Sequence, residues 1–155
     1  MPLDRDQIKA SYPLPVYNYR VTVESSTMGF SEVTGLNVEY EAVTYKHGLS
    51  FLTGAKIIPG MRQPIRLTLK KGIIKGDDFL AGWIRDAYNN PLVTAKKDIL
   101  IDLCDEAGTP VVRWKVMGAL PVKLTAPTFD AKSNEIAIQT LELVAHDIQV
   151  DYHPD

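Results

Sequence analysis

Histidine is the side chain most often used to bind metals and to move protons near neutral pH, and this chain contains His47, His146 and His153. The three are scattered, and no two of them have the spacing of a metal-binding motif such as H-E-x-x-H. His146 lies near the end of a strand pattern, where a surface histidine is commoner than a ligand, and His153 lies in a polar segment. We therefore expect no metal site and no cofactor.

Asp102, Asp105 and Glu106 are close enough in sequence to suggest a pair of catalytic carboxylates. Asp102, however, falls on the polar side of a strand pattern. Asp105 and Glu106 fall in a turn, where acidic residues are common for conformational reasons. We interpret all three as solvated acids rather than as a general acid and a general base.

Two further candidates lack the context that their chemistry requires. The segment 71–76 loosely resembles a phosphate-binding loop but does not meet G-x-x-x-x-G-K-[ST], so a strand-to-helix connection explains it better. Cys104 is the single cysteine, which excludes an internal disulfide, and its apolar strand context indicates a buried, unreactive thiol. We find no catalytic constellation, and the chain is predicted not to be an enzyme.

The composition is typical of one globular domain, which we expect to span residues 1–155. Apolar residues make up 45% and charged residues 23%, and 17 Lys and Arg nearly balance 19 Asp and Glu. There is no basic stripe of the kind that binds nucleic acid, and no apolar run approaches the roughly 18 residues of a membrane-spanning helix. The start of the sequence has no apolar signal-peptide region, so we expect synthesis in the cytoplasm and no direct membrane segment.

Most of the chain alternates apolar and polar residues with the period of two that is typical of half-buried strands. Before this pattern begins, residues 1–16 are polar and then rich in proline, which predicts an N-terminal arm. A slip of the alternation at Ala42 and Val43 predicts a β-bulge. The segments predicted as strands are Tyr17–Glu24, Phe30–Val33, Leu36–Tyr45, Ile65–Lys70, Ile99–Leu103, Val112–Val116, Ala119–Leu124 and Glu135–His146.

Residues 77–90 have helical periodicity instead, with Asp77 or Asp78 as the N-cap and a stop at Pro91. The apolar stripe of this predicted helix is expected to cover the protein's own barrel, and Trp83 lies at the centre of the stripe. The stripe consists of Phe79, Leu80, Trp83, Ile84, Ala87 and Tyr88, of which Phe79, Leu80, Trp83 and Ile84 are the expected core residues. The predicted fold is mainly β, an antiparallel barrel or sandwich with one flanking helix.

Residues 46–62 form the least regular stretch, a predicted long extended loop that contains Gly48, Gly54, Pro59 and Gly60. A loop of this length in a compact domain is usually functional. It carries more apolar side chains than a solvated loop would, namely Leu49, Phe51, Leu52, Ile57 and Ile58. We hypothesise that these five form a subunit interface; the alternative is that they cover their own barrel.

Eight segments distributed along the chain are weakly specific alone but specific in their order and spacing. They are Pro13–Val21, Gly29–Leu36, Ile58–Gly60, Leu67–Gly72, Trp83–Ile84, Arg113–Trp114, Ala119–Lys123 and Phe129–Ile138. Together they resemble the tail tube proteins of contractile phages and of extracellular contractile injection systems. The fold of this family is similar to that of the secreted hexameric tube proteins of type VI secretion.

The resemblance implies a structural inner-tube subunit, whose homo-hexameric rings stack into a hollow tube for delivery of protein cargo. The implied partners are a contractile sheath protein, a baseplate or spike, and a tube terminator. Such a particle would be released from the producing cell or anchored in it. Two alternatives from the same family are a tube-initiating paralogue at the baseplate and a type VI secreted tube protein. A monomeric ligand-binding β-barrel is a more distant alternative.

In a closed ring, the polar faces of the strands would line a water-filled lumen, and on a monomeric barrel they would face solvent. The residue pattern alone does not separate these two arrangements. The candidate lumen residues are Glu39, Glu41, Arg66, Thr68 and Lys70.

Overall fold

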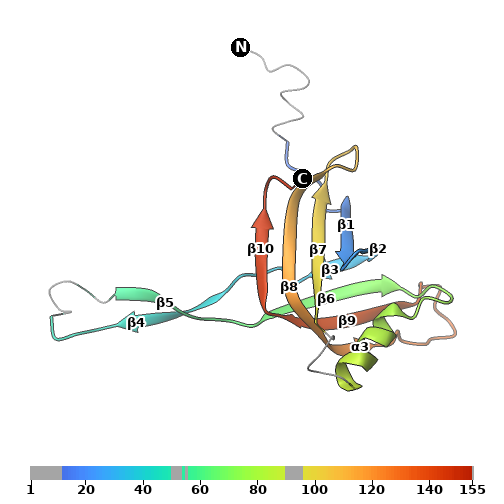
Figure 1. The fold of residues 1–155 in the computed structure, drawn as a ribbon. Helices are drawn as coiled ribbons and strands as arrows, with labels where there is room; N and C mark the ends of the chain where they lie inside the picture. The colour runs from blue at the N-terminus through green and yellow to red at the C-terminus, as the bar shows by residue number, and fades with distance from the viewer. Residues whose placement is uncertain (1–11, 50–53, 55, 90–95, 155) are drawn as a thin grey trace, which may run out of the picture.

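The computed structural model describes residues 12–49, 54, 56–89 and 96–154 (Figure 1). These residues form antiparallel strands and one described helix, which confirms the mainly β prediction. The strands are β1 (Tyr19–Val23), β2 (Ser26–Met28), β3 (Glu32–Thr34), β4 (Tyr40–Tyr45), β5 (Lys56–Arg62), β6 (Ile65–Gly72), β7 (Lys97–Cys104), β8 (Pro110–Thr125), β9 (Ile138–Ala145) and β10 (Asp147–Asp151), and the helix is α3 (Phe79–Asn89).

The main sheet has the strand order β2-β1-β7-β8-β9-β6-β3, with β10 also paired to β8. The long strand β8 joins two layers, because its first half pairs with β7 and its second half, from Leu120 onward, pairs with β9. We call the layer β2-β1-β7-β8-β10 sheet A and the layer β8-β9-β6-β3 sheet B; they are upright and roughly horizontal in Figure 1. Where β8 passes from one to the other, Gly118 has a φ of 65°, which favours glycine.

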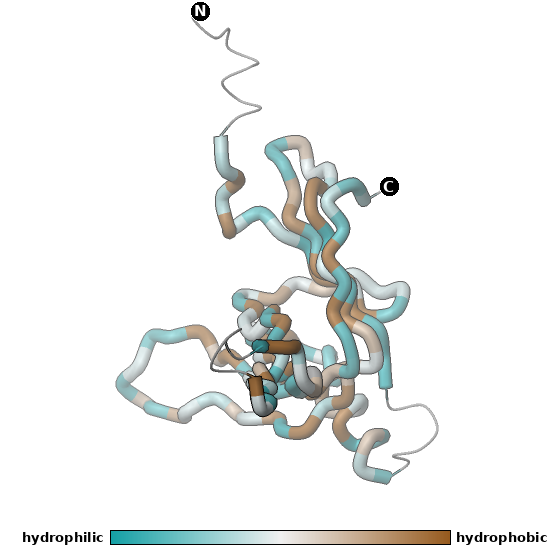
Figure 2. The backbone as a smooth tube through the Cα atoms, turned by 90° about the vertical axis from the view of Figure 1, so that its left-hand side faces the viewer, coloured by the Kyte–Doolittle hydropathy of each residue, from teal (hydrophilic) through white to brown (hydrophobic). Residues whose placement is uncertain are grey.

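The core lies between the two sheets and follows from the alternation of the strands. Along β6, Ile65, Leu67 and Leu69 are buried, while the residues between them face outward. The same alternation is visible along the upright strands in Figure 2. The buried cluster combines residues from β1, β6, β7, β8 and β9, so it depends on pairings between distant parts of the sequence.

The helix α3 packs against β8 at the lower end of the body (Figure 1). Leu80, Trp83 and Ala87 are buried, and Phe79 packs against Trp83 with 6.1 Å between ring centroids. Ile84 is partly buried. Tyr88, in contrast, is 86% exposed, so the predicted stripe is one residue too long. Asn89 is exposed as well, so the last two residues of the helix are not covered.

The start of α3 is held by Asp77, one of the two residues that the sequence predicts as its cap. Its Oδ1 accepts a hydrogen bond from the backbone N–H of Phe79 at 3.3 Å, and its Oδ2 forms an ion pair with Lys71. Lys71 ends the inward-facing row of β6, and its side chain is only 4% exposed. The segment 71–76 is thus a strand-to-helix connection, stabilised by a buried ammonium and a capping carboxylate.

The C-terminal half of the body differs from the prediction in two ways. Ala119–Leu124 is not a separate strand but the continuation of β8, with an irregularity after the buried Pro121. His146 is also not the end of the last strand. The chain bends there, between β9 and the additional strand β10. The additional strand β10 was missed because Asp147–Asp151 is short and mostly polar.

The predicted barrel is open in its hydrogen bonding. The described strand order ends at β2 and β3, and these two end strands are not paired with each other. They are joined through Gly29–Ser31, and the Tyr19 hydroxyl donates a 2.6 Å hydrogen bond to the carbonyl of Phe30 across this corner. The body is therefore two packed antiparallel sheets sharing β8 rather than a continuous cylinder.

The strands β4 and β5 form a separate two-stranded ribbon that projects far from the body (Figure 1). We call this ribbon the arm. The prediction that 46–62 is an irregular loop is wrong for its second part, because Lys56–Arg62 is strand β5. The bulge predicted at Ala42 and Val43 is wrong in its place. The register shifts between Tyr40 and Ala42, where β5 carries the extra residue, and the pairing is regular from Ala42 to Tyr45. Within the described residues, no helix is long and apolar enough to span a membrane.

Candidate assembly surfaces

The arm exposes apolar side chains on both of its faces. Directly paired residues share a face and successive pairs alternate, so the register assigns each residue. From Ala42 to Tyr45, the Val43 face consists of Val43, Tyr45, Lys56 and Ile58, and the Ile57 face consists of Ala42, Thr44, Ile57 and Pro59. Alternation along β4 adds Glu41 to the Val43 face and Tyr40 to the Ile57 face. A soluble two-stranded ribbon normally buries one face against a body, and this one buries neither.

The predicted interface residues lie in or beside this arm. Leu49 is 57%, Ile57 74% and Ile58 47% exposed. These three do not cover the protein's own barrel, which was the alternative interpretation of the segment. Phe51 and Leu52 lie outside the described residues.

Gly60 allows the two strands of the arm to approach closely. A Cβ at this position would lie 2.6 Å from the carbonyl oxygen of Glu41 and 2.7 Å from a methyl group of Val43. The contact with the oxygen is with backbone, which cannot move aside as a flexible side chain can. Any larger residue at Gly60 would therefore distort the ribbon.

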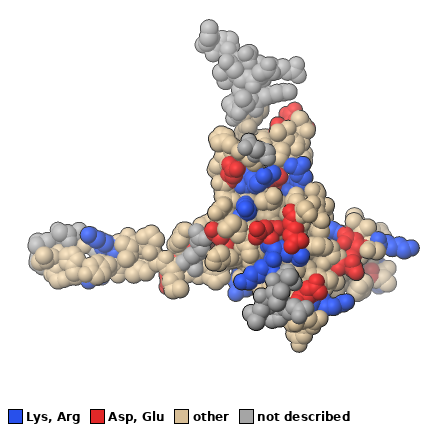
Figure 3. Space-filling view, in the orientation of Figure 1, with Lys and Arg blue, Asp and Glu red and all other residues tan. Residues whose placement is uncertain are grey.

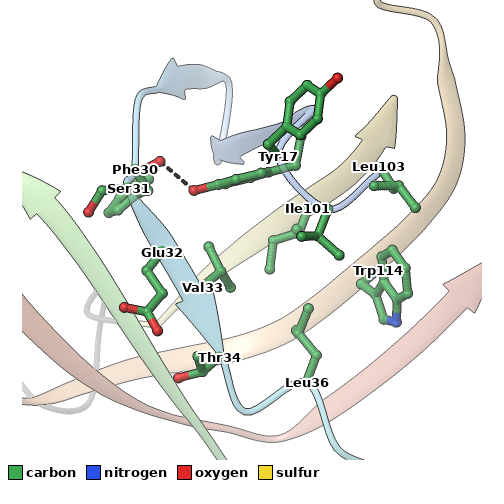
Figure 4. Close-up of a pocket in the computed structure, with 12 residues that line it drawn as sticks. Tyr17, Phe30, Ser31, Glu32, Val33, Thr34, Leu36, Ile101, Leu103 and Trp114 are labelled. Atoms are coloured by element: carbon green, nitrogen blue, oxygen red, sulfur yellow. Dashed lines mark hydrogen bonds between the residues drawn. The ribbon is translucent and has the colours of Figure 1, made fainter. Parts of the chain in front are cut away.

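A second apolar surface is an open groove of about 770 Å3 beside β3 (Figure 4). Its floor is the inner face of sheet A, with Tyr19, Ile101, Leu103 and Trp114. The opposite wall is β3 with the residues on either side of it. This wall consists of Phe30, Ser31, Glu32, Val33, Thr34 and Leu36, and the N-terminal rim consists of Val16 and Tyr17. The sequence pattern did not reveal the groove, because its residues come from four separate segments.

One charged side chain, Glu32, lines this groove. Its Oε2 lies 3.2 Å from Nζ of Lys70 on the neighbouring strand. The pKa of the Tyr19 hydroxyl is raised by burial and, secondarily, by the negative charge of Glu32. The groove is therefore apolar at its floor, and the Glu32 carboxylate at its rim is paired with Lys70 on the outer face of sheet B.

The outer face of sheet B carries three of the five candidate lumen residues. Arg66, Thr68 and Lys70 alternate with the buried residues of β6, and Thr68 is paired in register with Glu142 of β9. Glu39 shares a shallow hollow with Arg66 at the base of the arm, where its carbonyl accepts a 2.9 Å hydrogen bond from Gln63. Glu41 lies on β4, in the arm itself. The structure thus brings together four of the five.

The outer face of sheet A carries a row of alternating charges that the sequence interpretation missed. The register aligns Arg20, Asp102, Arg113 and Asp151 across β1, β7, β8 and β10. Acidic and basic groups are accordingly interleaved on the body in Figure 3, whereas the arm is mostly uncharged. The row has two basic and two acidic residues, so its net charge is zero.

Asp102 is not the solvated acid that its strand position suggested, since its side chain is only 2% exposed. Arg113 donates from Nε to Oδ1 at 2.7 Å and from Nη2 to Oδ2 at 3.1 Å, and Arg20 donates to Oδ2 at 3.3 Å. The hydrogen bonds to Asp102 raise the pKa of Arg113 above its ordinary value. Both carboxylate oxygens are used structurally, so this buried acid is an ion-pair centre.

The other candidate groups have structural surroundings. Asp105 Oδ1 accepts hydrogen bonds from the backbone N–H groups of Ala107 and Thr109, both at 2.9 Å, and so organises the turn between β7 and β8. Cys104 is buried with a free thiol, as predicted. Among the residues that the structure describes, no three His, Cys, Asp or Glu side chains form a group that could hold a metal ion.

Comparison with known proteins identifies the family. The family model of the T4-like virus tail tube protein gp19 matches residues 15–149. A chain from the extended PVC sheath–tube complex, an extracellular contractile injection system, is 35% identical with a TM-score of 0.85, covering 98% of this chain and 100% of that one. A chain from the anti-feeding prophage tube-terminating cap is 36% identical with a TM-score of 0.80, covering 92% and 93%.

A more distant likeness concerns the fold alone. Hcp1 from Flavobacterium johnsoniae is 18% identical with a TM-score of 0.52, covering 88% of this chain and 97% of that one. A comparison with curated proteins found no significant match. The family match covers both sheets, the helix and the arm, so the chain belongs to the T4-like tail tube protein family.

Proposed function

We propose that this protein is the inner-tube subunit of a contractile injection system, in which hexameric rings stack into a hollow tube that delivers cargo. The observation that carries the proposal is its 35% identity, over nearly the whole chain, to a chain of a contractile sheath–tube complex. A structural role also agrees with the chemistry of the chain, in which the buried acid Asp102 is used by two arginines. The corresponding partners are a contractile sheath, a baseplate with its spike, and a tube terminator.

The surfaces of the body and the arm support assembly from identical copies. The strands β2, β3 and β10 are at the edges of their sheets, and edge strands have unpaired backbone groups that favour pairing with another chain. The arm adds apolar side chains that are too exposed for an isolated molecule. We assign the subunit interface to Leu49, Phe51, Leu52, Ile57 and Ile58, of which Ile57 and Ile58 have the clearest structural support.

For the lumen we assign the outer face of sheet B, with Arg66, Thr68 and Lys70. This face is polar, and its charges are balanced by Glu32 and Glu142 on the neighbouring strands. A polar wall without a dominant sign of charge would let protein cargo pass without strong binding. The finished particle would act outside the producing cell, after release or from an anchored position.

Electron microscopy of the purified protein tests the tube. Negative staining should show rings or tubes, and light scattering should give a hexamer or a polymer of hexamers. A monodisperse monomer at tens of micromolar, without particles on the grid, would contradict the proposal and would favour the monomeric barrel instead.

A substitution in the arm tests the interface assignment separately. Ile57→Asp places a charge on a side chain that is 74% exposed in the monomer, so the fold should be unchanged while assembly is lost. Ile57→Leu is the matched control, because it keeps the apolar area and should still assemble. Assembly of the aspartate variant at the normal concentration would show that this side chain is not at an interface.

A terminal position in the tube is a second candidate, favoured by the 36% identity to a chain of the tube-terminating cap. The two roles differ in copy number, since a tube has many rings and one end. Purified particles should contain this protein in amounts comparable to the sheath if it forms the tube. The baseplate chain is 21% identical, a likeness that shows the fold alone, so a tube-initiating role has less support.

A further inference from the structure

The strand β8 runs without interruption from sheet A into sheet B, so the bend in this strand sets the orientation of one sheet relative to the other (Figure 1). The neighbouring chain bends at the same level. The register of β8 with β9 and β10 is continuous here, which places Gly118 directly opposite His146. The backbone N–H of His146 donates a 2.9 Å hydrogen bond to the carbonyl of Met117 across the bend. We call Met117, Gly118 and His146 the corner.

Gly118 is the residue of the corner whose backbone is least restricted. Its φ is 65°, and a Cβ at this position would lie 3.2 Å from the Cβ of His146, so the close approach of the two strands also favours glycine. Glycine, however, adopts positive and negative φ about equally well, so Gly118 does not hold one bend angle by itself. The angle therefore depends on the contacts that surround Gly118.

Asp98 supplies such a contact from the other side of β8. The pairing of β7 with β8 shifts register between Lys97 and Ile99, so that Met117 and Gly118 together face Asp98. Two residues facing one form a β-bulge, which bends the bulged strand and interrupts its regular hydrogen bonding. Oδ1 of Asp98 accepts a 3.1 Å hydrogen bond from the backbone N–H of Gly118. The carboxylate thus takes the place of a ladder carbonyl at the bulge.

The position of Asp98 is itself defined by its neighbours. Its backbone carbonyl accepts a 3.0 Å hydrogen bond from the N–H of Glu24, in the turn between β1 and β2. Nζ of Lys97 lies 3.2 Å from Oε1 of Glu24 and 5.9 Å from the centre of the Phe79 ring, at the start of α3. The segment that carries Asp98 is therefore tied to the hairpin of sheet A and contacts the helix, so the carboxylate has a fixed place from which to hold Gly118.

The hydrogen bond between Asp98 and Gly118 is exposed, so it restricts conformation more than it adds stability. Without the acceptor, the N–H of Gly118 would bond to water, and such an exchange changes the free energy of unfolding little. The buried core cluster includes neither residue, so the subunit should still fold. Loss of the acceptor should therefore widen the range of angles at the corner without unfolding the protein.

We infer that Asp98 is a positioning residue that selects one conformation of Gly118 and so fixes the angle between sheets A and B. The consequence for assembly rests on the proposed function, because each subunit of a closed hexameric ring turns the next by about 60°. The edge strands β2 and β10 belong to sheet A, and β3 belongs to sheet B. Contacts made through the edges of both sheets therefore meet at an angle that the corner sets.

Two nitroxide spin labels test the corner within one subunit. Gln149 on β10 of sheet A and Thr125 at the end of β8 in sheet B are exposed, and both are changed to Cys in a Cys104→Ser background. The labelled full-length protein is diluted into unlabelled protein, and double electron–electron resonance gives the distance between the labels. The distance distribution should be narrow with the native Asp98 and broader with Asp98→Ala. An unchanged distribution in Asp98→Ala would overturn the inference.

A conservative variant separates the hydrogen bond from the charge. Asp98→Asn removes the charge but keeps the Oδ1 acceptor, so its distance distribution should stay narrow. A distribution as broad as that of Asp98→Ala would show that the acceptor is not what holds the corner. Circular dichroism checks that each variant is folded. If Asp98→Ala is unfolded, Asp98→Ser takes its place with the same expected result, because the shorter side chain does not reproduce the reach of a carboxylate.

Electron microscopy of the unlabelled variants tests the consequence for assembly. Wild-type and Asp98→Asn rings should have one diameter, whereas Asp98→Ala should give open rings or rings of unequal diameter. Uniform rings from Asp98→Ala would overturn the link between the corner and ring closure. A wild-type protein that forms no rings would contradict the proposed function instead, and the label distances would still decide whether Asp98 fixes the corner.

Discussion

β6 in the body and β5 in the arm have similar shares of apolar residues, but those of β6 are buried and those of β5 are exposed. Ile65, Leu67 and Leu69 of β6 are at most 2% exposed, whereas Ile57 and Ile58 of β5 are 74% and 47% exposed. β6 has a strand on each side, β3 and β9, and a second sheet over its inner face. β5 has only β4. Partners in the same chain, not residue type, decide which apolar strand is core.

The comparison teaches what stabilises each region. An isolated two-stranded hairpin is marginally stable in water at best, while strands in a larger sheet share cross-strand contacts and a common core. We therefore expect the body to fold as a monomer and the arm to gain most of its stabilisation from contacts with other subunits. Substitutions in the two regions should then have different consequences, and four experiments examine this difference.

The largest contrast is between two valines that receive the same substitution. Val21→Asp places a charge at a position that is 1% exposed and should prevent folding, at a cost above about 4 kcal/mol. Val43→Asp in the arm should change the free energy of unfolding by less than about 0.5 kcal/mol but abolish assembly. Denaturant unfolding and sedimentation measure the two effects. Equal destabilisation by both would remove the distinction between body and arm.

The helix provides the next contrast within one element. Trp83→Ala removes a side chain that is 2% exposed and should cost about 3–5 kcal/mol of stability. Tyr88→Ala, one turn further along, should cost less than about 0.5 kcal/mol. Thermal unfolding measures both. A fully stable Trp83→Ala variant would mean that α3 is not the cover of its own sheets.

The charge row on sheet A belongs to the body and should contribute to stability in a graded way. Asp102→Asn leaves Arg113 and Arg20 without their buried anion and should cost about 2 kcal/mol, less than for a fully buried pair because both arginines are partly exposed. Asp151→Asn at the exposed end of the row is the control, with an expected loss below about 0.5 kcal/mol. Urea unfolding at neutral pH measures both; equal losses would argue against a special role for Asp102.

The smallest effect concerns the pH dependence at the start of α3. The ion pair with Lys71, together with the hydrogen bond from Phe79, lowers the pKa of Asp77 below its ordinary value of 3.8. A lowered pKa means that the folded state favours the carboxylate. The stabilisation, about 1 kcal/mol, is therefore complete at neutral pH and is lost as the pH falls through the folded-state pKa.

Comparison of the wild-type protein with Asp77→Asn isolates this contribution. The difference in unfolding free energy should be constant between about pH 7 and pH 5 and should shrink at more acidic pH. Assembly of the folded variant at neutral pH should be unchanged, because Asp77 belongs to the body. A difference that grows on acidification would show that the sign of the linkage is wrong.

The sequence alone determined those elements whose signal is local. Alternation with a period of two located β1, β6, β7 and the first half of β8, because each buries one face and exposes the other. The apolar stripe and a cap at Asp77 or Asp78 located α3, because helix periodicity and capping involve residues at most four positions apart. The exposed Tyr88 shows the limit, since an apolar stripe in the sequence does not reveal which of its residues the sheet will cover.

Only the tertiary structure decided the features that depend on distant partners. β5 has apolar residues on both faces and thus no alternation, so its strand character became evident only from its pairing with β4. Asp102 is buried because Arg20, 82 positions away, and Arg113 on the next strand both reach it. The groove arises where β3 stops short of covering sheet A. No local pattern contains this information, because burial is a property of which segments meet and not of any segment alone.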